Sequence, residues 1–282
     1  MSVAFFPGGA TVGVDVRGSA PGTRETDLLA PTASVSTVNA LVLSGGSAFG
    51  LASAHGVMTE LAARGIGHDT GFGVVPIVPA AVIFDLPVSG GNAPGEELGR
   101  RALENASDLD RSRGNIGAGT GATVGKYLGF GYMKGGLGQA ALEFADLEVS
   151  AAVVVNALGD VYDHGTKVAG THDENGFLPT ELFASATSSI TNTTIGIVAT
   201  NAALTKTEAT KVAQMSHDGL ARAINPIHTT DDGDLMFAAS TGDIPASVRT
   251  VGYMAAEAVR LAVLDAVASA TSLGTIPAAR DL

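Results

Sequence analysis

Hydrophobic and polar positions along the chain fall into two kinds of pattern. Short runs of apolar and β-branched residues predict strands over 12–16, 38–43, 130–144, 147–155, 193–200 and 235–239. Apolar residues at helical spacing predict helices from the glycine turn at 44–47 to residue 64, from 94 to 106, over 205–224 and over 251–268. The mixture predicts an α/β fold, with 130–144 and 147–155 forming a hairpin.

Three segments have weaker patterns. Pro76 and Pro79 interrupt the apolar run 74–86, so we expect irregular structure or an edge strand there, because proline cannot donate to a sheet ladder. The segment 160–179 is rich in Gly, Asp, His and Thr and is expected to be irregular, and 185–192 is small and polar, as in an exposed linker. The linker runs directly into the strand predicted to start at Thr193.

The last predicted helix carries few charges for its length. Glu257, Arg260 and Asp265 are its only charged residues, which indicates a helix buried between layers or at a subunit interface. No fixed-period repeat and no second core beyond a clear linker is visible, so we expect one domain over residues 1–282.

Composition narrows the class of protein. The 282 residues are 45% hydrophobic, enough for a sizeable core. The net charge of −12 argues against a general attraction to nucleic acid or anionic membranes, so we expect small molecules or copies of the same chain as partners. The absence of cysteine excludes disulfides and thiolate catalysis. Neither a secretory signal nor a membrane span is apparent, and we expect a cytoplasmic protein.

The sequence matches common nucleotide-binding and metal-binding motifs poorly. The glycine-rich stretch 117–122 lacks the preceding strand of a dinucleotide-binding fold. The residues around Lys126 lack the spacing of a phosphate-binding loop. Close packing of the backbone therefore explains these glycines better than nucleotide binding does. Six histidines occur without metal-ligand spacing. We therefore expect no cofactor and no metal. The acidic stretch 231–234 is either a turn with functional carboxylates or a solvated loop.

Five stretches together are similar to one known family. They are Ala20-Pro21-Gly22-Thr23-Arg24-Glu25-Thr26-Asp27, Ser44-Gly45-Gly46-Ser47-Ala48-Phe49-Gly50, Gly117-Ala118-Gly119-Thr120-Gly121, Asn192-Thr193-Thr194-Ile195 and Asp232-Gly233-Asp234. In this order they resemble the self-processing hydrolases that include L-aminopeptidase/D-esterase, the β-peptidyl aminopeptidases and the nylon-oligomer hydrolases. The resemblance runs through nearly the whole chain.

The resemblance implies a four-layer α/β/β/α sandwich and a site centred on Thr193. It implies cleavage between Asn192 and Thr193 into pieces 1–192 and 193–282, which stay together as one catalytic unit. The resemblance also places Lys126 and Asn156 near the nucleophile, with the acidic pair Asp232 and Asp234 beside them. By themselves, Lys126 would be taken for a surface lysine and Asn156 for a strand-capping turn residue.

The implied mechanism needs no histidine. Thr193 Oγ attacks the carbonyl of Asn192, and the freed α-amine, whose pKa is about 7.7–8.0 in model compounds, then serves as the base. Lys126 supplies positive charge, and Asn156 donates to the developing oxyanion. The two aspartates either orient Lys126 and the amine or bind an amino group of the substrate.

One residue departs from the family pattern. Some members have Tyr before Asp in an Ile-Tyr-Asp motif, whereas Phe84 precedes Asp85 here, so a phenolic contact to the substrate is missing. We expect hydrolysis of small peptides, amino-acid amides or oligoamides. An acyltransferase of similar architecture and a non-catalytic binding or assembly homologue are the alternatives. By resemblance we expect a homo-oligomer, a tetramer. Members of the family usually have a further stretch before the first strand. This chain begins close to the first predicted strand.

Overall fold

The computed structural model describes residues 1–185 and 192–282. Residues 186–191 of the predicted linker lie outside this range, whereas its last residue, Asn192, is buried instead of exposed. Eight of the described strands form one ladder, in the order β2 (Gly22–Arg24), β6 (Ala80–Val82), β3 (Val38–Ser44), β1 (Ser2–Val16), β17 (Leu235–Ile244), β15 (Thr193–Ala202), β10 (Leu147–Asn156) and β9 (Gly136–Phe144).

Strand β1 divides this ladder into two sheets. Its residues 2–5 pair with β3 and its residues 11–16 pair with β17, and the register shifts between Phe5 and Ala10. The shift contains Pro7 and Gly9, and Gly9 has a φ of 77° that favours glycine. The irregularity lets a single strand leave one sheet and enter the other.

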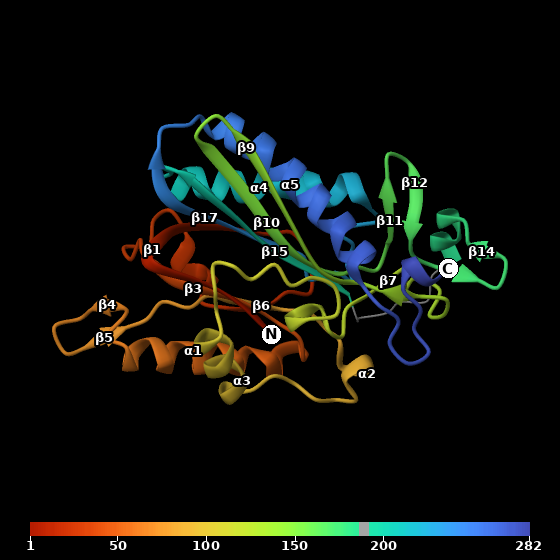
Figure 1. The fold of residues 1–282 in the computed structure, drawn as a ribbon, viewed down its shortest axis with the longest axis horizontal. Helices are drawn as coiled ribbons and strands as arrows, with labels where there is room; N and C mark the ends of the chain where they lie inside the picture. The colour runs from red at the N-terminus through yellow and green to blue at the C-terminus, as the bar shows by residue number, and fades with distance from the viewer. Residues whose placement is uncertain (186–191) are drawn as a thin grey trace.

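Helices cover the outer faces of the two sheets (Figure 1). The helices α4 (Lys206–Ala223) and α5 (Val248–Ser269) lie on the sheet of β9, β10, β15 and β17, and α1 (Ala52–Ala63) and α3 (Glu96–Glu104) lie on the other side. Three buried apolar clusters fill the spaces between helices and sheet, between the two sheets, and between the second sheet and its helices. The predicted four-layer α/β/β/α sandwich is confirmed.

The central strands show why both sheet faces are buried. In β17, Met236 and Ala238 belong to the cluster under α4 and α5, while Leu235, Phe237 and Ala239 face the second sheet. Side chains of a strand alternate between faces, so a nearly continuous apolar run is needed where both faces are covered.

The remaining elements are short. They are the helix α2 (Leu86–Ser89), the strands β4 (His68–Asp69), β5 (Val74–Val75), β7 (Thr123–Val124), β8 (Met133–Lys134), β11 (Asp160–Asp163), β12 (Thr166–Ala169), β13 (His172–Asp173), β14 (Gly176–Phe177) and β16 (Ile224–Asn225), and the 3-10 turns η1 (Thr26–Leu29), η2 (Ser47–Leu51), η3 (Gly117–Gly119), η4 (Thr180–Ser185) and η5 (Ala279–Asp281).

Most predicted elements are confirmed, including the hairpin of β9 and β10. Thr205 caps α4 in a capping box with Glu208. The low charge of α5 follows from packing against α4, β9 and β10 within the same chain, so it no longer argues for a subunit contact.

Three sequence-based expectations were wrong. Strand β1 begins ten residues before Val12, at Ser2, because its bulge resembles a turn in the sequence. Strand β6 pairs on both sides, with β2 and β3, because Pro79 precedes the paired residues. The segment expected to be irregular, 160–179, contains the β11–β12 hairpin.

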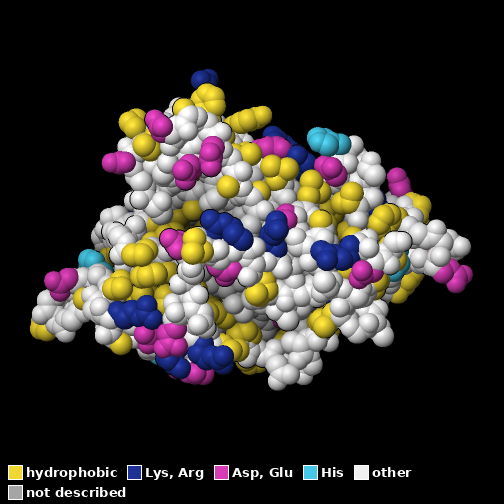
Figure 2. All heavy atoms as spheres, in the orientation of Figure 1, with side chains coloured by type: hydrophobic (Ala, Val, Ile, Leu, Met, Phe, Trp, Pro, Cys, Tyr) yellow, Lys and Arg dark blue, Asp and Glu magenta, His cyan; other side chains and the backbone are white. Residues whose placement is uncertain are grey.

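None of the helices in the described part of the chain has the length and apolar character needed to cross a bilayer. On the face shown in Figure 2, Lys and Arg side chains lie among acidic ones.

Candidate active site

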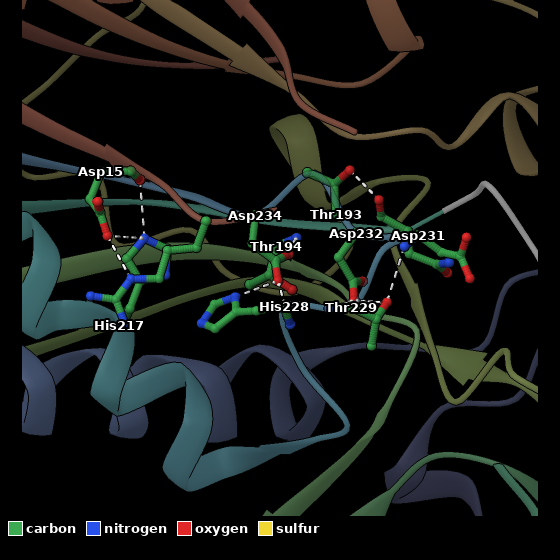
Figure 3. Close-up of polar contacts among 11 residues, drawn as sticks. Asp15, Thr193, Thr194, His217, His228, Thr229, Asp231, Asp232 and Asp234 are labelled. Carbon is green, nitrogen blue, oxygen red and sulfur yellow. Dashed lines mark hydrogen bonds and ion pairs between the residues drawn. The ribbon is translucent and has the colours of Figure 1, made fainter. Parts of the chain in front are cut away.

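Thr193 is the first residue of the central strand β15. Its partner in the neighbouring strand β10 is Asn156, and the preceding Asn192 bridges to Asp232. Asn192 and Thr193 are only 2% and 4% exposed. The Thr193 hydroxyl donates a hydrogen bond to the carbonyl oxygen of Asn192 (Figure 3). In the intact chain, the predicted nucleophile therefore lies against the carbonyl of the predicted scissile bond.

Gly233 brings a backbone donor to the same carbonyl. Its backbone nitrogen lies 3.3 Å from the Asn192 oxygen, to which its N–H donates. A Cβ on residue 233 would lie 2.8 Å from Thr193 Oγ1 and 2.5 Å from the carbonyl oxygen of Ala20, which is closer than side chains normally approach. This close approach requires glycine, and the donor is placed to stabilise negative charge on the carbonyl oxygen.

Lys126 is buried, in contrast to the surface position that its local sequence indicates. It is 6% exposed, and its Nζ donates to Oδ1 and to the carbonyl oxygen of Asn156, at 2.9 and 3.0 Å. Burial lowers the pKa of Lys126 to about 7, although the charges of Asp232 and Asp85 oppose this shift. A sizeable fraction of the lysine is consequently neutral near pH 7 and able to accept a proton.

Asn156 connects the lysine to the surrounding loops. Its Oδ1 accepts hydrogen bonds from Lys126 and from the backbone N–H of Thr123, at 3.0 Å for the latter. Its Nδ2 donates to the Phe84 carbonyl at 3.1 Å. In the intact chain this amide holds the lysine in place, and donation to an oxyanion stays a prediction.

The acidic stretch is a buried turn, since Asp232 and Asp234 are both fully inaccessible. Asp234 Oδ1 accepts the Thr194 N–H at 2.6 Å, and its Oδ2 accepts the N–H and Nδ1–H of His228. Asp232 Oδ2 accepts the N–H and hydroxyl of Thr229. Burial and the charge of Asp234 raise the pKa of Asp232 to about 6. Asp232 therefore acts on Lys126 through its charge, whereas Asp234 fixes the residue after the predicted nucleophile.

A pocket of about 170 Å³ opens beside Lys126. Phe84, Asp85, Thr123 and Tyr132 are among its lining residues, so Phe84 lies where a substrate would contact it. Asp85 accepts the Gly46 N–H at 2.6 Å, and burial raises the pKa of its carboxyl group. Within residues 1–185 and 192–282, no three acidic or histidine side chains are grouped as metal ligands would be.

The structure thus brings all five predicted catalytic residues to one end of the central strands. Sequence reasoning missed Gly233, His228, Thr229 and Asp85. Gly233 was visible inside the Asp-Gly-Asp motif, but only its approach to Thr193 reveals its importance. His228 had no signal beyond its proximity to the acidic stretch.

The family can now be assigned. The model of peptidase family S58 matches residues 3–279. The chain belongs to this family. It is 41% identical to an uncharacterised aminopeptidase of Mycobacterium tuberculosis, over all of this chain and 89% of that protein. It is also 34% identical to the 6-aminohexanoate-oligomer endohydrolase of Paenarthrobacter ureafaciens, over 86% of this chain and 69% of that protein.

The fold also has solved counterparts. The L-aminopeptidase D-Ala-esterase/amidase of Ochrobactrum anthropi, described as a variant of the Ntn hydrolase fold, superposes with a TM-score of 0.73 at 19% identity, over 97% of this chain and 77% of that one. The family and the fold agree, and this member of family S58 is an amide-bond hydrolase. The predicted enzyme class is confirmed, and the alternative of a non-catalytic homologue is not supported.

Proposed function

We propose that this hydrolase is made as a precursor that cuts itself between Asn192 and Thr193, and that Thr193 then acts as an N-terminal nucleophile on small peptides, amino-acid amides or oligoamides. The observation that carries the proposal is the position of the Thr193 hydroxyl against the Asn192 carbonyl, whose oxygen also accepts the Gly233 N–H. Nucleophile, target and oxyanion donor are thereby assembled in one buried place.

Self-cleavage begins with a shift of the acyl group from nitrogen to oxygen. Neutral Lys126 takes the hydroxyl proton as Thr193 Oγ attacks the Asn192 carbonyl carbon, and the Gly233 N–H stabilises the resulting oxyanion. The C–N bond then breaks, and the nitrogen of Thr193 receives the proton. Water opens the ester, which leaves a carboxylate on Asn192 and both a free amine and a free hydroxyl on Thr193.

Turnover repeats this chemistry on an external amide. The new α-amine accepts the hydroxyl proton, Thr193 attacks the substrate carbonyl, and the amine product departs before water releases the acyl group. The pocket beside Lys126 supports this reading because it is bordered by Phe84 and opens next to the site. The substrate class follows the names of the relatives, which include aminopeptidases and an oligomer endohydrolase.

The intact mass of the purified protein under denaturing conditions tests self-cleavage. Wild type is expected to give two masses split after Asn192, whereas Thr193→Ala stays whole. Thr194→Val is the matched control, because Thr194 is equally buried and its hydroxyl has no hydrogen-bond partner among the described residues. This variant should still cleave. Cleavage in Thr193→Ala, or an intact wild type, would contradict the proposal.

Two further measurements test the finer parts of the proposal. Product analysis with an added amine distinguishes hydrolysis from acyl transfer, because the two differ only in the acceptor. We also propose a cytoplasmic homo-oligomer, a tetramer by resemblance. Light scattering tests the tetramer, and a monomer would contradict it.

A further inference from the structure

Two histidines lie behind the acidic turn, and no step above uses them. His217 belongs to α4 and is fully buried, and His228 lies in the loop between β16 and β17. Their rings meet edge to face, with centroids 4.8 Å apart and planes at 71°. Figure 3 shows the pair on the side of Asp234 away from Thr193. Their position makes them part of the support of the site.

His228 supplies most of the hydrogen bonds that hold the Asp234 carboxylate. Its Nδ1 and backbone N lie 2.8 and 3.1 Å from Oδ2, while the Thr194 N–H occupies Oδ1. Within the part of the chain that the structure describes, no Lys or Arg forms an ion pair with Asp234. A buried carboxylate without a cation depends on such donors, so the loss of the His228 ring would remove one of the three hydrogen bonds to Asp234.

The hydrogen bonds also determine the protonation of the pair. His228 Nδ1 faces a carboxylate and carries a proton, and His217 Nε2 faces the Asp15 carbonyl at 3.0 Å and carries another. The remaining ring nitrogens, His228 Nε2 and His217 Nδ1, are buried without a partner among the described residues. Burial lowers the pKa of His217 to about 4, so this ring is neutral near pH 7. Arg17 and the Asp15 carboxylate face the pair from the end of β1, and Asp234 faces it from the loop.

The backbone of His228 is unusual. Its φ of 56° lies in the left-handed region, which is uncommon for residues other than glycine and in which Asn, Asp and His are enriched. Glycine would adopt this conformation without strain. A substitution at this position must therefore tolerate a positive φ.

We propose that His228 is a positioning residue for self-cleavage. It clamps Asp234 against the Thr194 N–H and so holds the 232–234 turn on the strand, with the Gly233 N–H on the Asn192 carbonyl. His217 fixes the orientation of the His228 ring through the edge-to-face contact. This inference rests on the proposed function, since it names a residue on which that same cleavage depends.

The test compares two substitutions that both tolerate a positive φ. His228→Gly removes the side-chain donor, whereas His228→Asn keeps an N–H at a similar distance along the side chain. Precursor conversion is followed by intact mass from about pH 5 to about pH 9, a range that spans the pKa of Lys126 at about 7. We expect roughly 10- to 100-fold slower cleavage in His228→Gly, the size expected for losing a hydrogen bond to a charged group. His228→Asn should retain most of the wild-type rate.

Folding and coupling are controlled separately. Each substitution is also made in the Thr193→Ala background, where a melting transition reports the fold of the uncut chain. If His228 acts through Asp234, the double variant His228→Gly/Asp234→Asn should cleave no more slowly than Asp234→Asn alone. A purely structural role would instead give additive losses and no rescue by Asn.

The outcomes are distinguishable. If the wild type cleaves and His228→Gly cleaves at the same rate, the positioning role is wrong and the proposed function stands. The same conclusion follows if His228→Asn cleaves as slowly as His228→Gly. An intact wild-type chain would overturn both.

Discussion

The substitution Gly233→Ala tests the geometry of self-cleavage most directly. The added Cβ would lie 2.8 Å from Thr193 Oγ1 and 2.5 Å from the Ala20 carbonyl oxygen. Both neighbours are constrained, because Thr193 begins a central strand and the Ala20 N–H is itself bonded to the Asp232 carbonyl. The turn must therefore move away from the strand, which lengthens the 3.3 Å contact between the Gly233 N–H and the Asn192 oxygen.

Two losses are expected from this movement. Overpacking of this kind costs about 1–3 kcal/mol of stability. Removal of one oxyanion donor slows a reaction about 100- to 1,000-fold, or about 3–4 kcal/mol in the activation barrier. The assay is the rate at which purified precursor gives two masses, together with the melting temperature in the Thr193→Ala background.

Gly242→Ala is the matched control. A Cβ there would lie 2.3 Å from the Asn201 carbonyl oxygen, an equally severe clash at the opposite end of β17. We expect it to lower the melting temperature comparably and to leave self-cleavage nearly unchanged. Wild-type cleavage by Gly233→Ala would refute the oxyanion role of the Gly233 N–H.

Three further predictions concern other parts of the molecule. Self-cleavage should accelerate as the pH rises through about 7, where Lys126 loses its proton. The Lys126→Arg precursor should stay intact at every pH, because arginine remains charged. Intact mass measures both effects. Phe84→Tyr adds a hydroxyl to the pocket wall, and should change KM for amide substrates by up to about tenfold while self-cleavage proceeds. Lys167 lies 2.5 Å from the Asp160 carboxylate, and Asp160→Ala removes this ion-pair partner. The substitution should lower the free energy of unfolding of the Thr193→Ala precursor by about 3 kcal/mol, measured by denaturant unfolding.

The parts of the fold that rest on local patterns could be predicted from the sequence. Apolar residues at helical spacing over 205–224 predict α4 within a residue at either end. The first half of β1 could not be found in this way. Its Pro7 and Gly9 are typical of a turn, and only pairing with two distant strands makes them a bulge.

The same distinction between local patterns and distant contacts applies to the site residues. Thr193 was identifiable as the first residue of a strand after a polar segment. The buried state of Lys126 was not, because it depends on Asn156 at the end of another strand, and local sequence favoured a surface lysine. The resemblance to a family supplied the residues, but the donor on Gly233 and the clamp from His228 became visible only through contacts between distant segments.

Cleavage at Thr193 would create a new titrating group inside the protein. Strand β15 lies between β10 and β17, and Thr194 stays bonded to Asp234, so the new α-amine forms in place without rearrangement of the sheet. Burial disfavours its charged form, whereas the neighbouring carboxylates of Asp232 and Asp234 favour it.

In the proposed mechanism, self-cleavage precedes this amine and should follow the pKa of Lys126, at about 7. The pH profile of precursor conversion and that of amide hydrolysis by the mature enzyme should therefore have different midpoints. Intact mass gives the first profile, and release of product from an amino-acid amide gives the second. Coincident midpoints would mean that the freed amine is not the base in turnover and that Lys126 serves both reactions.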